Sequence, residues 1–357
     1  MPYVEDMKER QQRHLAFWNK ENHDRPTLLV TAPKEGAKHR AVTPPPTLEQ
    51  RWTDEDYIIE SSRAWFESTW FGGESLPTIN PNLGPDIFGA YLGCDIVFGE
   101  STSWAKPIIQ DWETYRVPAI DTENPWWKKM LHMTEHFVED SNGDYLVGIT
   151  DLHPGSDGLV SLRGPQELCC DLLDYPEQVK QALWDTMPPF RQSLDTLYKL
   201  TTRHQWSSTN WSGLWHPGNW YIVCSDFSCM ISQEMYREFV LPELTAEVNS
   251  LDASFYHLDG PGALKHLDDI LSIEKLGGVQ WVYGAGQPTA AHWLPVLQKI
   301  QNAGKLIQVE VFPQDLDVLL ENLRPEGVMM NLSGARTEEE AKALIRKVEK
   351  SYKRKYF

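Results

Sequence analysis

The sequence lacks the patterns by which several protein classes are recognised. Its five cysteines form no Cys-x-x-Cys pair, so neither a disulfide framework nor a thiolate zinc knuckle is indicated. No run approaches the roughly 18 apolar residues that a membrane-spanning helix needs. Residues 1–20 are charged and do not resemble a signal peptide. We therefore expect a cytoplasmic protein.

Basic residues are scarce relative to acidic ones. The chain has 33 Lys and Arg against 51 Asp and Glu, which gives a formal net charge of −18. Such a surface repels phosphate backbones and anionic lipid, so we expect neither nucleic acid nor a membrane as a partner. The sequence also contains no Gly-x-Ser-x-Gly, P-loop or dinucleotide-binding glycine pattern after an expected strand. These absences speak against serine hydrolase, P-loop and dinucleotide-dependent chemistry.

What the sequence does contain is a regular alternation of short apolar runs and amphipathic segments, clearest in its second half. Residues 279–283 and 306–311 predict buried strands, and residues 55–70, 290–303 and 337–352 predict helices. Strands that are apolar throughout and separated by helices indicate a parallel sheet covered on both faces. Eight strand starts can be counted: Thr27, Thr78, Tyr145, Ser207 (or a strand at 220–224), Phe255, Val279, Leu306 and Gly327.

Eight alternating units predict an α/β fold of the (β/α)8 TIM barrel type. The 357 residues exceed the usual length of about 250 by about 100, which we assign to an N-terminal cap and long βα loops. No linker or composition change divides the chain, so we predict a single domain over residues 1–357. A doubly wound open sheet is the alternative architecture.

The strand expected at 254–256 ends in His257 and Asp259, which offer an imidazole and a carboxylate. Side chains at positions i and i+2 of a strand point the same way, so both can converge beyond the carboxyl end, where parallel α/β proteins build active sites. Together they suit zinc or another divalent ion, and Glu310 near the end of the 306–311 strand could be a third ligand. The plain alternative is a hydrogen bond that orders the strand end.

Other strand ends offer further candidates for proton transfer. Asp151 and His153 share one face after the Tyr145 strand and could position a substrate or move a proton. Asp226 either faces the pocket or caps the next helix, and loop-borne His216 is a less specific candidate. Asp157, between two glycines, is expected to begin a turn.

Tryptophan is abundant, with 15 residues, many of them near Gly or Pro in expected loops. Such rings either cover core beneath long loops or line a deep aromatic pocket, and composition does not separate these two interpretations. On the second interpretation, the residues we expect to contact substrate are Trp211, His216, Asp151, Tyr283, Asn80 and Trp104.

Three segments together resemble the uroporphyrinogen decarboxylase-like superfamily. Residues 226–232 read DFSCMIS, which resembles an acidic residue followed by Met-Ile-Ser-Pro, with Gln233 in place of the proline. Residues 257–260 read HLDG, similar to the superfamily's His-x-Cys-Gly or His-x-Asp-Gly strand end, and residues 162–177 resemble its helix pair. The resemblance covers about residues 145–350 and implies a (β/α)8 barrel.

Within this superfamily the chain resembles the corrinoid-dependent methyltransferases, including proteins of the trimethylamine corrinoid protein-like type. That branch implies methyl transfer between a small O- or N-methyl compound and a corrinoid carried by a partner protein, since this chain lacks the corrinoid module's DxHxxG motif. The implied catalytic residues are His257, Asp259, Asp226 and His153, with zinc or another divalent metal on His257, Asp259 and Glu310. Asp259 stands where the branch has a cysteine, which makes the ligand set rich in oxygen.

Two other functions stay open from the sequence. A cofactor-free decarboxylase acting on a tetrapyrrole or other carboxylated ring is one, although the RQAGR-like segment of that branch is absent and Arg25, Arg40 and Arg51 are scattered. A non-catalytic binding protein with the same pocket is the other. A homodimer is an open possibility for the assembly.

Overall fold

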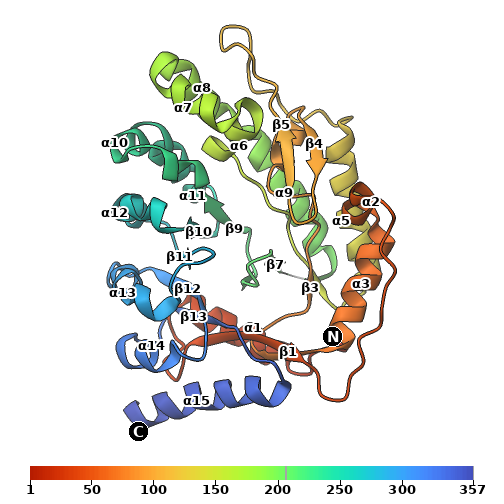
Figure 1. Ribbon diagram of the computed structural model, residues 1–357, viewed down its shortest axis with the longest axis vertical. Helices are drawn as coiled ribbons and strands as arrows, with labels where there is room; N and C mark the ends of the chain where they lie inside the picture. Colours follow the sequence, from red (N-terminus) through yellow and green to blue (C-terminus); the bar gives the residue numbers. More distant parts are fainter. Residues whose placement is uncertain (206, 357) are drawn as a thin grey trace.

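The computed structural model describes residues 1–205 and 207–356, and its centre is a seven-stranded sheet (Figure 1). The strand order is β2-β1-β13-β12-β11-β10-β9. Neighbours run parallel except β1 and β2, which are antiparallel. The strands are β1 (Thr27–Pro33), β2 (Thr69–Gly73), β9 (Trp220–Cys224), β10 (Ala253–Asp259), β11 (Gly278–Val282), β12 (Leu306–Val311) and β13 (Val328–Leu332).

The parallel strands are apolar because helices cover their outer side. In β12, for example, every residue is buried except Glu310 near its carboxyl end. Figure 1 shows the helices of this half outside the strands. They are η1 (Asp226–Met230), α10 (Gln233–Met235), η2 (Tyr236–Val240), α11 (Leu241–Asn249), η3 (Pro261–His266), α12 (Leu267–Leu271), η4 (Ala290–Trp293), α13 (Leu294–Asn302), α14 (Leu316–Asn322) and α15 (Glu338–Tyr356).

Shorter strands face this sheet across the molecule (Figure 1). They are the parallel pair β3 (Thr78–Ile79) and β6 (Leu146–Val147), the hairpin β7 (Ser208–Thr209) and β8 (Trp215–His216), and the hairpin β4 (Asp95–Phe98) and β5 (Ser103–Lys106). The helices here are α2 (Leu48–Thr53), α3 (Glu55–Glu67), α4 (Ile87–Tyr91), α5 (Pro125–Ser141), α6 (Gly155–Arg163), α7 (Pro165–Asp174), α8 (Pro176–Asp185) and α9 (Met187–Gln205).

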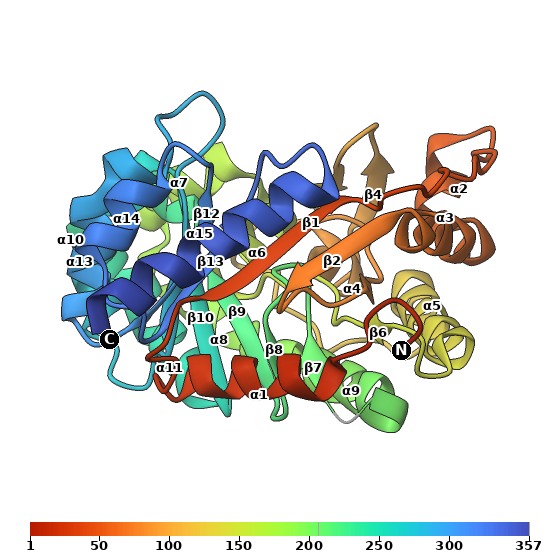
Figure 2. The same cartoon turned by 90° about the horizontal axis from the view of Figure 1, so that it is seen from below.

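The first helix, α1 (Met7–Trp18), lies across the amino ends of the strands (Figure 2). Phe17 and Trp18 contact Phe255 with ring centroids 6.0 and 5.2 Å apart, and Trp18 also meets Trp220 at 5.6 Å. The Trp18 indole donates a hydrogen bond of 2.9 Å to the carbonyl of Trp215. Because this aromatic packing covers the amino ends, polar side chains at the carboxyl ends are left to form a site.

The structure confirms an α/β protein with a mostly parallel central sheet, and a strand begins within two residues of each of the eight expected starts. The hydrogen-bonded ladder of the large sheet ends at β2 and β9 among the described residues, and the short strands form separate sheets. The hydrogen-bonded ladders therefore do not by themselves form a closed (β/α)8 barrel among the described residues.

Two local predictions were wrong. The helix expected from Glu55 to Trp70 ends at Glu67, and Thr69–Gly73 forms the antiparallel strand β2. Threonine and aromatic side chains fit a pleated, half-buried surface better than a helix end. The stretches at 207–211 and 220–224 were treated as alternatives, but both contain strands.

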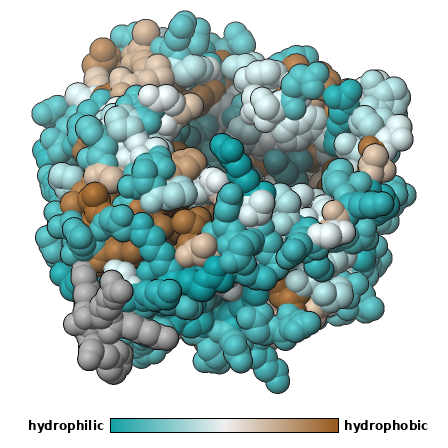
Figure 3. All heavy atoms as spheres, turned by 60° about the horizontal axis from the view of Figure 1, so that its bottom comes forward, coloured by the Kyte–Doolittle hydropathy of each residue, from teal (hydrophilic) through white to brown (hydrophobic). Residues whose placement is uncertain are grey.

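The surface and the helices agree with the charge and hydropathy of the sequence. Figure 3 shows a face on which hydrophilic residues predominate, in keeping with 51 acidic and 33 basic residues. Within the described ranges, no helix combines the length and apolar character needed to cross a bilayer.

Candidate functional site

Three side chains converge at the carboxyl ends of β9 and β10, and we call them the rim cluster: Asp226, His257 and Asp259. His257 and Asp259 lie two residues apart on β10, and Asp226 begins η1 directly after β9. One potential ligand atom from each lies within 4.8 Å of the others. An imidazole and two carboxylates at this spacing are a donor set for a divalent metal with open coordination positions.

The imidazole of His257 is held on two sides. Its Nδ1 lies 2.5 Å from Oε1 of Gln280 on β11. The ring of Trp211, in the β7–β8 loop, meets it edge-on with centroids 5.3 Å apart and planes at 87°. These contacts fix the ring orientation and leave Nε2 without a hydrogen-bond partner among the described residues.

The two carboxylates of the rim cluster are exposed and accept no hydrogen bond or ion pair from the described residues. Desolvation of the carboxyl by the surrounding protein raises the pKa of Asp226 from 3.8 to about 6, and the charge of Asp157 adds to the shift. His257 and His153 oppose it. Two neighbouring carboxylates without partners repel each other, and a cation between them would relieve that repulsion.

A second group, His153, Asp157 and Cys224, lies deeper beside the first, and we call it the inner cluster. Buried Asp157, in the first turn of α6, accepts hydrogen bonds from the backbone N–H groups of Asp226 and Phe227, both at 2.9 Å. The Cys224 thiol donates to the same carboxylate at 3.3 Å, and burial raises the pKa of that thiol well above its usual range. Asp157 therefore orders the start of η1, which carries Asp226.

His153 forms an ion pair with Asp151, with Nε2 2.9 Å from Oδ1. Burial alone would lower the pKa of His153, but Asp151, then Asp157 and Asp226, outweigh it and raise the pKa to about 10. Burial acts to raise the pKa of Asp151. His153 and a hydrogen bond of 3.1 Å donated by the Trp211 indole outweigh burial, so the pKa of Asp151 is lowered overall. His153 is therefore a cation at neutral pH and is not free to bind a metal.

Glu310 does not join the rim cluster, so the expected set of His257, Asp259 and Glu310 does not come together. It lies on β12, two strands from β10, and its carboxylate accepts hydrogen bonds from Tyr283 at 3.2 Å and Ser333 at 2.7 Å. Asp226 takes its place because β9, not β12, is a neighbour of β10.

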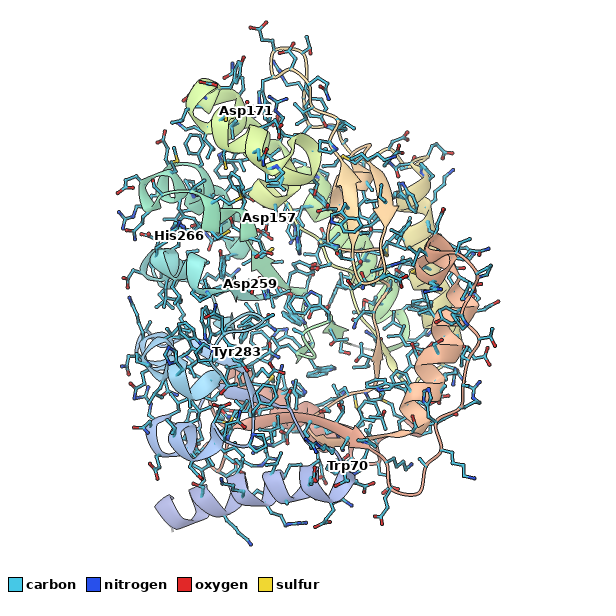
Figure 4. All side chains as sticks on the ribbon, viewed as in Figure 1. Trp70, Asp157, Asp171, Asp259, His266 and Tyr283 are labelled. Carbon is cyan, nitrogen blue, oxygen red and sulfur yellow. The ribbon has the colours of Figure 1, made fainter. Side chains whose placement is uncertain are left out.

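A cavity of about 620 Å³ opens at Glu310. Tyr283, Asn331 and the loop at 284–287 line it, and no Lys, Arg or His does. In Figure 4, Asp157, Asp259 and Tyr283 follow one another along the same inner side of the strands, whereas His266 lies outward among the helices. The cavity therefore continues the row of polar groups that includes the rim cluster.

The remaining expected contact residues are dispersed. Trp104, on β5, is 53% exposed on the β4–β5 hairpin. His216 packs edge-on against Trp18 of α1, with centroids 5.0 Å apart, near the amino ends of the strands. Asn80 follows β3, and its buried Oδ1 has no hydrogen-bond partner among the described residues. It packs so close to Gly148 that a Cβ there would lie 1.9 Å from this oxygen.

Sequence reasoning missed several residues of the site. Gln280 and Cys224 carried no motif, and Asp157 was interpreted as the start of a turn. Glu243 and Glu247 of α11 are 3% and 2% exposed near the inner cluster, and burial raises the pKa of Glu243 to about 8. Their spacing of four residues on one helix face was the available signal, but an acidic pair on a helix ordinarily predicts a solvated surface.

Comparison with known proteins adds a structural likeness. No protein-family model and no curated protein sequence matches the chain. A methyltransferase from Methanosarcina mazei matches with a TM-score of 0.63 over 98% of this chain and 99% of that one, at 13% sequence identity. At this identity the likeness establishes that the two chains share a fold over nearly their whole lengths.

Proposed function

We propose that this protein is a methyltransferase that moves a methyl group between a small O- or N-methyl compound and a corrinoid held by a partner protein, with the help of a divalent metal. The observation that carries the proposal is the convergence of Asp226, His257 and Asp259 within 4.8 Å at the strands' carboxyl ends. The shared fold with a methyltransferase and the resemblance at residues 226–232 and 257–260 support it.

The donor chemistry of the rim cluster fits zinc or another divalent ion. Asp226 and Asp259 have carboxylates without partners, and Nε2 of His257 is unengaged. A bound ion would act as a Lewis acid on the oxygen or nitrogen that loses its methyl group. With no thiolate in the set, the site favours such an ether or amine donor over a soft thiol.

His153 is the side chain best suited to donate a proton during methyl transfer. It is protonated at neutral pH and held by the ion pair with Asp151, and its charge acts to lower the pKa of Asp226. When Asp226 serves as a ligand, the imidazolium remains beside the cluster to neutralise charge on the departing heteroatom. Trp211 contacts both Asp151 and His257, so it aligns the proton carrier with the ligand.

The cavity at Glu310 is the proposed place for the rest of the methyl donor. Its hydroxyl, amide and single carboxylate groups suit a ligand that donates hydrogen bonds. We further propose that the six parallel strands of the large sheet, together with β3 and β6, make up a (β/α)8 barrel, and that the corrinoid protein docks over its carboxyl end. The same lining disfavours a decarboxylase for a multiply carboxylated ring, because no cationic side chain lines it.

Metal content and turnover test the proposal together. Purified wild type should contain a stoichiometric divalent ion, and His257→Ala should not. Wild type should also transfer methyl groups to cob(I)alamin or to a corrinoid protein when O- and N-methyl compounds are supplied. Equal metal content in both proteins would remove the ligand assignment, and binding of a tetrapyrrole with decarboxylation would replace the function.

A further inference from the structure

A row of buried amide side chains runs from His257 across the neighbouring strands. Gln280 on β11 is paired in register with His257, and Gln308 on β12 is paired with Gln280. Gln280 is 6% exposed and Gln308 is fully buried. Burying two amides among apolar strand residues is costly unless every polar atom finds a partner, so their placement calls for a role that apolar side chains could not fill.

The amides form a continuous chain of hydrogen bonds. Nδ1 of His257 lies 2.5 Å from Oε1 of Gln280, whose Nε2 donates to Oε1 of Gln308 at 3.0 Å. Nε2 of Gln308 then donates to the backbone carbonyl of Ser212 at 2.8 Å and to Oδ1 of Asn331 at 3.3 Å. The chain thus begins at the rim cluster and ends on main chain in the β7–β8 loop.

The end of the chain determines its direction. A backbone carbonyl only accepts hydrogen bonds, so Gln308 must present its NH2 group to Ser212 and its oxygen to Gln280. Gln280 must then present its NH2 group to Gln308 and its oxygen to His257. An amide oxygen also only accepts, and therefore Nδ1 of His257 must carry a hydrogen.

We propose that Gln280 and Gln308 are positioning residues that fix the tautomer of His257. With hydrogen held on Nδ1, the neutral ring keeps the lone pair of Nε2 available, which is the form that binds a metal or accepts a proton. The same loop contributes twice, since Ser212 anchors the chain and Trp211 packs against the ring. The inference deepens the proposed function and rests on it for its consequence, although the tautomer is a property of the protein alone.

Nitrogen NMR of the metal-free wild type tests the tautomer directly. Long-range 1H–15N spectra, recorded at a pH where the ring is neutral, should show hydrogen on Nδ1 of His257 and none on Nε2. The loss of these signals in His257→Gln assigns them. Hydrogen on Nε2, or an even mixture of both tautomers, would overturn the proposal, and no variant of the amides has to fold for this result.

Titration with Co²⁺ tests the consequence. Gln280→Leu should weaken Co²⁺ binding by about 10- to 100-fold, whereas Gln280→Glu, which keeps an acceptor at Nδ1, should bind within a few-fold of wild type. Gln301→Leu is the matched control, because Gln301 is a 7% exposed amide on α13 that bonds to Arg324 away from the site. Unchanged binding in Gln280→Leu, or an equal loss in Gln301→Leu, would contradict a positioning role.

The two measurements separate this inference from the proposed function. If wild type binds no Co²⁺, the metal assignment fails, while the NMR result still decides the tautomer. If wild type binds Co²⁺ but carries hydrogen on Nε2 before binding, the metal assignment stands and the amide chain does not position the ring.

Discussion

The rim cluster and the inner cluster lie side by side and contain similar side chains, yet they are built in opposite ways. In the inner cluster His153 is paired with Asp151, and Asp157 accepts two backbone N–H groups and the thiol of Cys224. In the rim cluster two carboxylates have no partner among the described residues, and His257 is bonded at one nitrogen. Closeness of ligand atoms is therefore not sufficient for a metal site, because the atoms must also have unused capacity to donate electron pairs.

The largest expected effect concerns metal binding. His257→Ala should lower bound metal from stoichiometric to trace amounts and slow methyl transfer by at least about 100-fold, since one ligand of three is lost. Cys224→Ala should keep its metal, because that thiol is protonated and already donates to Asp157. Elemental analysis of the purified proteins checks both, and loss of metal in Cys224→Ala alone would assign the ion to the inner cluster.

The second effect concerns stability, for which we expect the inner cluster to matter more than the rim cluster. Asp157→Ala should lower the free energy of unfolding by about 3 kcal/mol, because two N–H groups at the start of η1 lose a charged acceptor. Exposed Asp259→Ala should change it by less than about 0.5 kcal/mol. Urea denaturation of the metal-free proteins makes the comparison, and similar losses in the two variants would erase the distinction between the clusters.

The third effect is the pH dependence of the rim cluster. Because the folded-state pKa of Asp226 is about 6, above its ordinary 3.8, the folded protein binds more protons between these values. The free energy of unfolding of the metal-free protein should therefore fall as pH rises through this window, and metal affinity should rise as the proton leaves. Asp226→Asn should flatten the stability profile. An unchanged profile in this variant would show that Asp226 titrates normally.

The fourth expected effect is the alkaline behaviour of the inner cluster. The pKa of His153 is raised from 6.5 to about 10, so the stability it contributes is complete below pH 6.5 and is lost as pH rises through 10. His153→Gln should reduce this alkaline loss relative to wild type, as followed by thermal unfolding between pH 7 and 10. A variant whose decline matches that of wild type would mean that the pair with Asp151 does not hold the proton.

The fold was predictable where local and long-range preferences agree. Strands β10 to β13 are covered on their outer side and read as apolar runs, so their positions and order of appearance follow from the sequence. The first half was harder, because β3 and β6 have two residues each and β2 continues directly from a helix. Such short strands are defined by their neighbours in space, which a single sequence does not reveal.

The candidate site was predictable within a strand and not between strands. The two-residue period indicated that Asp151 shares a face with His153, and that His257 and Asp259 converge. The structure shows an ion pair in the first case and ligand atoms within 4.8 Å in the second. Choosing Glu310 as the third ligand required the strand order, in which β12 is separated from β10 by β11. Asp157 looked like a turn residue because its partners are backbone groups about 70 residues later in the chain.

Helix α1 has a consequence for the order of events in the proposed reaction. Its aromatic side chains pack against the amino ends of β9 and β10, so in the proposed barrel the polar groups would be reached from the carboxyl ends of the strands. A small methyl donor and a large protein acceptor would then use the same entrance to the site. If the proposed reaction holds, the small molecule would bind before the large one covers the entrance, and the kinetics would be ordered, with excess acceptor inhibiting the entry of the donor.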